Sequence, residues 1–194
     1  MLDNLKDYTI ILASQSPRRQ ELLKMANVSF EVVIVPDVPE DFPSTMPVEE
    51  VAEFLAGQKQ KAYEHLWSKP QTLVITADTI VELKGRVINK PADRAEAIQM
   101  LQQLSANKHR VLTGVVLRSA EKQQAFTSVT EVWFKALKRD DIEYYVDHYQ
   151  PFDKAGAYGV QEWIGLIGVS QINGSFYNVM GLPVAKLYEE LSAF

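Results

Sequence analysis

The segment Ser14–Arg19 carries side chains that suit the binding of a phosphate anion. It reads Ser-Gln-Ser-Pro-Arg-Arg and follows an apolar run at Thr9–Ala13, which predicts a buried strand. Pro17 favours the first turn of a helix, and the free N–H groups of a helix N-terminus attract anions. The two arginines would add bidentate donors for phosphate oxygens. The alternative is that Ser16 only caps the helix and that both arginines are solvated.

Asp78 is a candidate proton acceptor or metal ligand. It follows the apolar run Leu73–Ala77, which predicts a strand that ends at Asp78 and Thr79. Ligands of open α/β sheets bind at the carboxyl ends of strands, where a carboxylate can hold a divalent cation or accept a proton from water. The alternative is that Asp78 and Thr79 only satisfy the backbone of a turn.

Three lysines and one glycine-rich segment form a second group of candidates. Lys59 lies on a predicted helix, Lys90 precedes a proline, and Lys154 lies in the segment Asp153–Gln161. Two glycines and two alanines in that segment would permit close approach of the backbone to a ligand, and Gln161 can both donate and accept hydrogen bonds. The segment matches no phosphate-loop pattern, so a bend at a sheet corner is the alternative.

Composition excludes several kinds of chemistry. The chain of 194 residues has no cysteine, which rules out disulfides, thiolate metal sites and cysteine nucleophiles. His65, His109 and His148 are far apart and lack metal-ligand spacing. The net charge of −5 and the absence of a basic stripe argue against nucleic acid as a partner. No apolar run reaches the about 20 residues of a membrane span, and the N-terminus does not resemble a signal peptide, so a cytoplasmic protein is expected.

These residues must be positioned by strands and helices, and the two kinds of element do not alternate strictly along the sequence. This order predicts an α/β protein with a mixed sheet. Two helices are predicted to begin at Pro17 and at Pro183. Three more are predicted over residues 48–66, 93–104 and 140–149. The predicted strands span 9–13, 30–35, 73–77, 111–117, 125–134 and 166–172, with a hairpin over 80–88 and a loop over 36–47.

Six segments, in order along nearly the whole chain, resemble the Maf family of nucleoside triphosphate pyrophosphatases. They are Leu12–Leu23, Leu55-Ala56 with Lys59, Ala77–Thr79, Lys90-Pro91, Asp153–Gln161 and Asn173–Pro183. The resemblance implies a single domain over residues 1–194. It also implies an elongated, bent mixed sheet flanked by helices, with two lobes around a cleft, similar to inosine triphosphatases.

The resemblance implies hydrolysis of a nucleoside triphosphate to the monophosphate and pyrophosphate, with Mg²⁺ or Mn²⁺ as cofactor. Ser-Pro-Arg-Arg, Ala-Asp-Thr and the terminal Gln161 resemble the branch that acts on dTTP and UTP. Asp78 then matches the general base and a metal ligand, and Glu40 matches a second acidic ligand. The residues implied in choosing the nucleobase are Arg19, Thr79 and Gln161. The residues implied in binding phosphates are Ser14, Arg18, Lys59, Lys90 and Lys154.

The implied role is house-cleaning of the nucleotide pool by a homodimer, with a link to the arrest of cell division. Two departures from the family pattern stand out. One extra residue precedes Glu40, and Asn89 replaces a glycine before Lys90. Two alternatives stay open: a nucleotide-sensing regulator of septum formation that needs no catalysis, and a pyrophosphatase for deaminated purine triphosphates.

Overall fold

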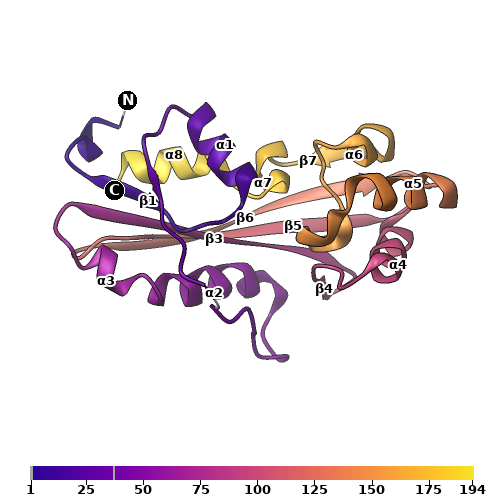
Figure 1. The fold of residues 1–194 in the computed structure, drawn as a ribbon, viewed down its shortest axis with the longest axis horizontal. Coiled ribbons are helices and arrows are strands. Elements are labelled where there is room, and N and C mark those ends of the chain that lie inside the picture. The colour runs from indigo at the N-terminus through magenta and orange to yellow at the C-terminus, as the bar shows by residue number, and fades with distance from the viewer. Residues whose placement is uncertain (1, 37) are drawn as a thin grey trace. The chain divides into compact units, whose positions relative to one another are not determined.

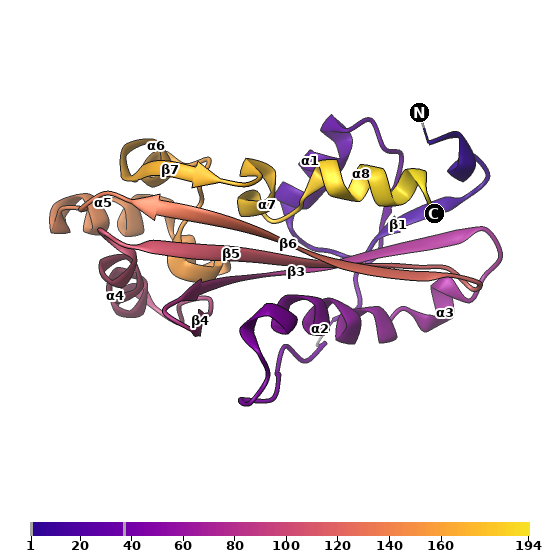
Figure 2. The same cartoon turned by 180° about the vertical axis from the view of Figure 1, so that it is seen from behind.

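The strands of the protein form one mixed sheet flanked by helices, which confirms the predicted fold class (Figures 1 and 2). The computed structural model describes residues 2–36 and 38–194, so Asp37 of the predicted loop lies outside the described residues. The described strands are β1 Thr9–Leu12, β2 Glu31–Val32, β3 Thr72–Leu83, β4 Arg86–Ile88, β5 Lys108–Arg118, β6 Gln123–Phe134 and β7 Val169–Asn173. The described α-helices are α1 Pro17–Met25, α2 Val48–Lys61, α3 Glu64–Trp67, α4 Arg94–Leu104, α5 Arg139–Tyr149, α6 Trp163–Gly168, α7 Phe176–Met180 and α8 Val184–Ser192. Short 3₁₀ helices cover η1 Asp3–Leu5, η2 Pro151–Asp153 and η3 Ala155–Ala157.

The strand order explains why the sheet is mixed. The strands follow one another as β2-β1-β3-β5-β6-β7, and β4 also pairs with β3. β1 is parallel to both of its neighbours, with Leu12 opposite Val32 of β2 and Ile75 of β3. The β3–β4 and β6–β7 pairs are antiparallel. The hairpin predicted over 80–88 is confirmed by the first of these pairs.

The chain folds into two compact units that alternate along the sequence. Unit 1 comprises Met1–Asp78, Thr113–Ser128 and Gly181–Phe194. Within unit 1, α2 and α3 cover one face of β3, and α1 and α8 lie on the other (Figures 1 and 2). The apolar faces of α1, α2 and α8 supply buried side chains such as Leu23, Leu55 and Leu187, and burial of such side chains is the main favourable term in folding.

Unit 2 comprises Thr79–Leu112 and Val129–Met180. The side chains of Leu101 on α4, Ile142 and Tyr145 on α5, and Ile164 on α6 are fully buried in one apolar cluster. The predicted start of α4 is confirmed, because the Asp93 side chain accepts a hydrogen bond from the Glu96 N–H.

The prediction that a strand ends at Asp78 is wrong. β3 continues without interruption from Thr72 to Leu83, so Asp78 and Thr79 lie in its interior. Aspartate is disfavoured inside strands, and its appearance after an apolar run therefore suggested a turn. A charged partner described below accommodates the Asp78 carboxylate at this buried position.

Other element boundaries also differ from the prediction. β2 covers only two residues of the predicted strand 30–35, because it pairs with β1 at two positions only. The predicted helix 48–66 breaks into α2 and α3 at Tyr63, which is buried and whose hydroxyl accepts a hydrogen bond from the Val35 N–H at 2.9 Å. Residues 166–168 belong to α6 and not to a strand; apolar runs this short fit either structure.

Candidate active site

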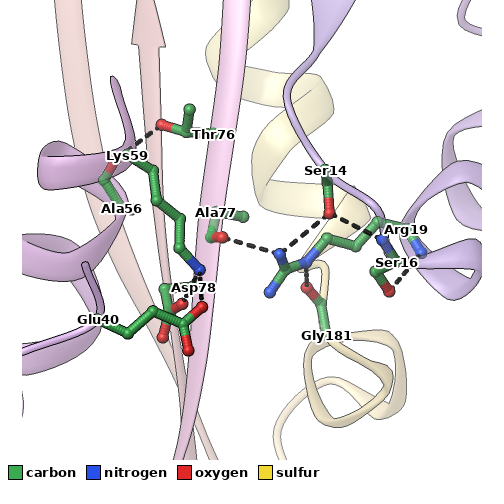
Figure 3. Close-up of polar contacts among 10 residues, drawn as sticks. All are labelled: Ser14, Ser16, Arg19, Glu40, Ala56, Lys59, Thr76, Ala77, Asp78 and Gly181. Atoms are coloured by element: carbon green, nitrogen blue, oxygen red, sulfur yellow. Dashed lines mark hydrogen bonds and ion pairs between the residues drawn. The ribbon is translucent and has the colours of Figure 1, made fainter. Parts of the chain in front are cut away.

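Arg19 binds the backbone of β3 at the point where its neighbour β1 ends. In the parallel pair, the Ala13 N–H donates to the Ile75 carbonyl at 2.9 Å. Carbonyl groups two residues apart on a strand face the same neighbour, so the Ala77 carbonyl is the next acceptor on this edge. Arg19 Nη1 donates to it at 2.8 Å, and Arg19 Nε donates to the Gly181 carbonyl at 2.8 Å (Figure 3). Arg19 therefore links α1, β3 and the segment before α8.

The start of α1 is fixed by two serines. The Ser16 side chain accepts from the Arg19 N–H at 3.5 Å and caps the helix, which is one part of the alternative considered for this segment. The buried Ser14 Oγ accepts from the Ser16 N–H at 3.2 Å and from Arg19 Nη1 at 3.3 Å (Figure 3). These contacts preorganise the segment that resembles a phosphate-binding site.

Lys59 on α2 lies between two carboxylates. Its Nζ is 2.5 Å from Asp78 Oδ1 and 2.7 Å from Glu40 Oε1 (Figure 3). The Lys59 and Asp78 side chains are only 17% and 11% exposed, so water screens this pair weakly. The Glu40 side chain is 45% exposed and belongs to the segment between β2 and α2. Three side chains far apart in sequence thus converge at one point.

Thr76 explains why Lys59 reaches Asp78. Residues two apart on a strand face the same side, so Thr76 and Asp78 both face α2. The buried Thr76 hydroxyl lies 2.9 Å from the Ala56 carbonyl and 2.7 Å from Gln60 Oε1. These contacts anchor the last turns of α2 on β3. The sequence analysis did not single out Thr76 and Gln60; the spacing of Thr76 from Asp78 was the available signal.

The charges of this group act on one another. Burial lowers the pKa of the Arg19 guanidinium, while Asp78 opposes that shift and neighbouring Arg18 adds to it. Arginine stays protonated in proteins even so. Arg19 therefore remains a fixed positive charge within electrostatic reach of Asp78 and Glu40.

The donor set fits a divalent cation in one respect. Glu40 and Asp78 present carboxylate oxygens to the same position, which the Lys59 ammonium takes in this structure. Mg²⁺ is commonly bound through one or two carboxylates together with substrate phosphates. Among the described residues, no group of three or more His, Cys, Asp or Glu side chains could hold a metal ion. These two carboxylates therefore fit a cation that arrives with phosphate ligands.

The remaining predicted site residues belong to unit 2. Thr79 follows Asp78 in β3, and exposed Lys90 follows β4. Lys154 is buried, and its Nζ lies 2.7 Å from Asp153 Oδ1 and 3.2 Å from Glu162 Oε1. The Gly156 N–H donates to the Asn89 carbonyl at 3.1 Å, which joins the segment of Lys154 to that of Lys90.

Gln161 has an unusual polar atom. Its side-chain Oε1 is buried and has no hydrogen-bond partner among the residues that the structure describes. Buried acceptors in native proteins are nearly always paired, so this oxygen is suited to a donor from a ligand. The sequence analysis ended its candidate segment at Gln161 and missed Glu162, whose contacts are described below.

Residues 9–194 match the protein family described as Maf-like protein. The chain is 53% identical over 191 residues to a dTTP/UTP pyrophosphatase of Bacteroides fragilis, with 98% of each chain covered. It is 48% identical over 195 residues to a dTTP/UTP pyrophosphatase of Porphyromonas gingivalis, covering 100% of this chain and 98% of the relative.

Among solved structures, the Ham1 protein of Staphylococcus aureus has a similar fold. The TM-score is 0.50 at 18% sequence identity, and the match covers 94% of this chain and 99% of the other. In the described parts of the chain, no helix combines the length and apolar character needed to span a membrane.

Proposed function

Because the chain belongs to the Maf-like family, we propose that it hydrolyses dTTP and UTP to the nucleoside monophosphate and pyrophosphate. The observation that carries this proposal is the 53% identity, across 98% of both chains, to a relative named dTTP/UTP pyrophosphatase. The candidate site supports it, because Arg19, Lys59 and Asp78 supply the cations and the carboxylate that such a reaction needs.

In the proposed reaction, water attacks the α-phosphorus and pyrophosphate leaves. Asp78 accepts the proton of the attacking water through a carboxylate oxygen. Lys59 keeps that carboxylate in place before substrate binds, and its ammonium then stabilises negative charge on the phosphates. A divalent cation bound by Glu40 and Asp78 would add positive charge at the phosphate oxygens and make the water more acidic.

The other phosphate contacts in the proposal come from the family resemblance. These residues are Ser14, Arg18, Lys90 and Lys154. Lysine and arginine offset the charge of a departing pyrophosphate, since phosphoryl transfer depends mainly on positioning and electrostatics. Within unit 1, Arg19 and Lys59 lie within electrostatic or ion-pair reach of Asp78, and such local positive charges suit a triphosphate although the whole chain carries a net charge of −5.

The choice of nucleobase is assigned to Gln161 together with Arg19 and Thr79. Uracil and thymine each offer two carbonyls and one ring N–H. The Gln161 amide can donate to a carbonyl and accept from the N–H, and its Oε1 has no partner among the described residues. Arg19 already binds two carbonyls of the protein, so its part in the choice would be to hold the site in shape.

A nucleotide panel tests the proposal. The protein is mixed with dTTP, UTP, CTP, ATP, GTP and ITP in the presence of Mg²⁺, and the products are identified. We expect pyrophosphate and monophosphate to form fastest from dTTP and UTP. Preferred hydrolysis of ITP would support a pyrophosphatase for deaminated purines, and binding without pyrophosphate release would support a non-catalytic regulator. Either result would overturn the proposal.

The homodimer, the cytoplasmic location and the use of Mg²⁺ or Mn²⁺ are parts of the same proposal. They rest on the family resemblance, and gel filtration, cell fractionation and metal replacement after chelation test them in turn.

A further inference from the structure

The Glu162 carboxylate connects two groups of unit 2. Glu162 is the residue before α6, and its side chain is 20% exposed. Its Oε1 lies 3.2 Å from the ammonium of buried Lys154. Its Oε2 accepts a hydrogen bond from the hydroxyl of Tyr145, a fully buried residue of α5. One carboxylate therefore joins a fixed tyrosine of the core to a lysine of the candidate site.

The same Tyr145 hydroxyl holds the other end of a short turn. It accepts a hydrogen bond from the Gly159 N–H at 3.0 Å. The Glu162 N–H in turn donates to the Gly159 carbonyl at 3.0 Å. A Cβ at position 159 would lie 2.7 Å from Glu162 Cδ, so a side chain there would force the carboxylate to shift from this position. Gln161 lies inside this turn, and both ends of the turn are bound to Tyr145.

Burial makes this arrangement stiff. The pKa of the Tyr145 hydroxyl is raised, first by burial and then by its hydrogen bond to Glu162, so it remains a donor at neutral pH. Tyr145 also stacks on Tyr149, with ring centroids 5.0 Å apart. Because the Tyr145 hydroxyl is held in the core, its hydrogen bond restricts the movement of the Glu162 carboxylate.

We infer that Glu162 and Tyr145 are positioning residues for nucleobase selection, because together they fix the turn that presents the Gln161 amide. The inference rests on the proposed function, which assigns the nucleobase to Gln161. Glu162 also orients the Lys154 ammonium, so it links the predicted base-selecting and phosphate-binding groups of this segment. Neither residue contacts the substrate in this account.

Two substitutions separate positioning from charge. Tyr145→Phe removes the hydroxyl that holds both ends of the turn and leaves every charge in place. Glu162→Gln removes the negative charge beside Lys154 but keeps an oxygen that can accept from Tyr145. If the geometry of the turn determines nucleobase preference, that preference changes in Tyr145→Phe. If only the negative charge beside Lys154 matters, the preference changes in Glu162→Gln and not in Tyr145→Phe. Glu131→Gln is the matched control, because Glu131 also pairs with a lysine of unit 2, Lys108, at 2.7 Å.

The experiment measures dissociation constants of the full-length protein for α,β-methylene-UTP and α,β-methylene-CTP by titration calorimetry with Mg²⁺. These analogues cannot be cleaved between the α- and β-phosphates, so binding is measured without turnover. We expect Tyr145→Phe to reduce the preference for the uridine analogue by about tenfold, Glu162→Gln to reduce it by a few-fold, and Glu131→Gln to leave it unchanged. Thermal unfolding of each variant is followed in parallel.

An unchanged preference in Tyr145→Phe, with or without a loss of thermal stability, would overturn the inference and leave a structural role only. Equal binding of both analogues by the unsubstituted protein would also overturn it. A preference lost as expected, in a protein that releases no pyrophosphate from UTP, would retain the inference and reject the proposed hydrolysis. The nucleotide panel on the unsubstituted protein thus separates the two failures.

Discussion

Asp78 is the residue on which the proposed chemistry depends, because it combines a buried position with a charged partner. Burying a charged side chain in a strand interior is costly unless an opposite charge compensates for the lost hydration. Lys59 supplies that cation at 2.5 Å, and Glu40 shares it. In the proposed reaction, the same carboxylate accepts a proton after substrate phosphates draw the Lys59 ammonium away.

Asp78→Asn removes the proton acceptor and keeps the shape of the side chain. General base catalysis contributes about a hundredfold to ten-thousandfold, so kcat for UTP should fall by about that much while the far-UV circular dichroism stays the same. Asp147→Asn is the control, since Asp147 is an exposed carboxylate whose partner is Arg94. If Asp78→Asn retains a kcat within about threefold of the unsubstituted protein, Asp78 is not the base.

The sequence indicated which residues belong to the candidate site, but it did not indicate which groups they contact. Ser14, Arg19, Lys59 and Asp78 were already candidates from the local sequence pattern, and the family resemblance added Glu40. The structure places Ser14 and Arg19 in one group of contacts and Glu40, Lys59 and Asp78 in a second, and the two groups meet the neighbouring residues Ala77 and Asp78 of β3. Their partners among backbone carbonyls could not be predicted, because such contacts depend on where strands end. Thr76 appeared only within the predicted strand 73–77 and Tyr145 only within the predicted helix 140–149, although each anchors a segment that carries candidate site residues.

Among the elements, β3 and α2 do most to build the site. The sequence correctly predicted a strand and a helix here, and it predicted their ends wrongly. A polar pair after an apolar run is typical of a turn, whereas the salt bridge from α2 permits the strand to continue. This is a tertiary effect that local propensity does not contain.

The close packing of α2 on β5 allows a test of whether the position of α2 determines stability and activity. A Cβ at Gly114 of β5 would lie 2.3 Å from the backbone of Ala52 and Glu53 in α2, so the helix would have to shift. Gly114→Ala should lower the free energy of unfolding by about 1–3 kcal/mol and reduce kcat, because Lys59 moves with α2. Urea denaturation and steady-state kinetics measure both effects.

Gly57→Ala is the matched control on the same helix. A Cβ at Gly57 meets nothing within 4 Å, and alanine has a higher helix propensity than glycine. This substitution should raise the free energy of unfolding by up to about 1 kcal/mol without loss of kcat. Equal stability of the two alanine variants would contradict the role given to Gly114.

For the whole molecule, the order of the predicted strands and helices and the family resemblance both predicted a mixed α/β fold, and the structure and the comparisons confirm it. The family resemblance is also confirmed, by a match over residues 9–194. The division into two compact units made of interleaved segments could not be predicted from local patterns, since it depends on contacts between distant parts of the chain. The predicted elongated, bent form and the cleft stay predictions.

Burial of one histidine predicts how the stability of the protein depends on pH. His109 in β5 is 1% exposed, its Nε2 lies 2.7 Å from the Tyr158 hydroxyl, and burial lowers its pKa to about 4. The unfolded chain, with an ordinary histidine pKa near about 6.5, binds the proton more readily. The stabilisation is therefore complete above that value and is lost as the pH falls towards about 4.

Urea denaturation at several pH values measures this effect. Between pH 7 and pH 5 the free energy of unfolding should fall by about 2 kcal/mol from this residue. In His109→Gln, which cannot titrate, the fall over this interval should be smaller by that amount. Parallel pH profiles of the two proteins would show that His109 is not held neutral by burial.

The position of bond cleavage distinguishes a pyrophosphatase that directs water to the α-phosphorus from other nucleotide hydrolases. UTP is hydrolysed by the unsubstituted protein in ¹⁸O-labelled water, and the products are analysed by mass spectrometry. Attack of water on the α-phosphorus predicts one labelled oxygen in UMP and none in pyrophosphate. Label in pyrophosphate, or orthophosphate as the first product, would place the attack on another phosphorus and contradict the account.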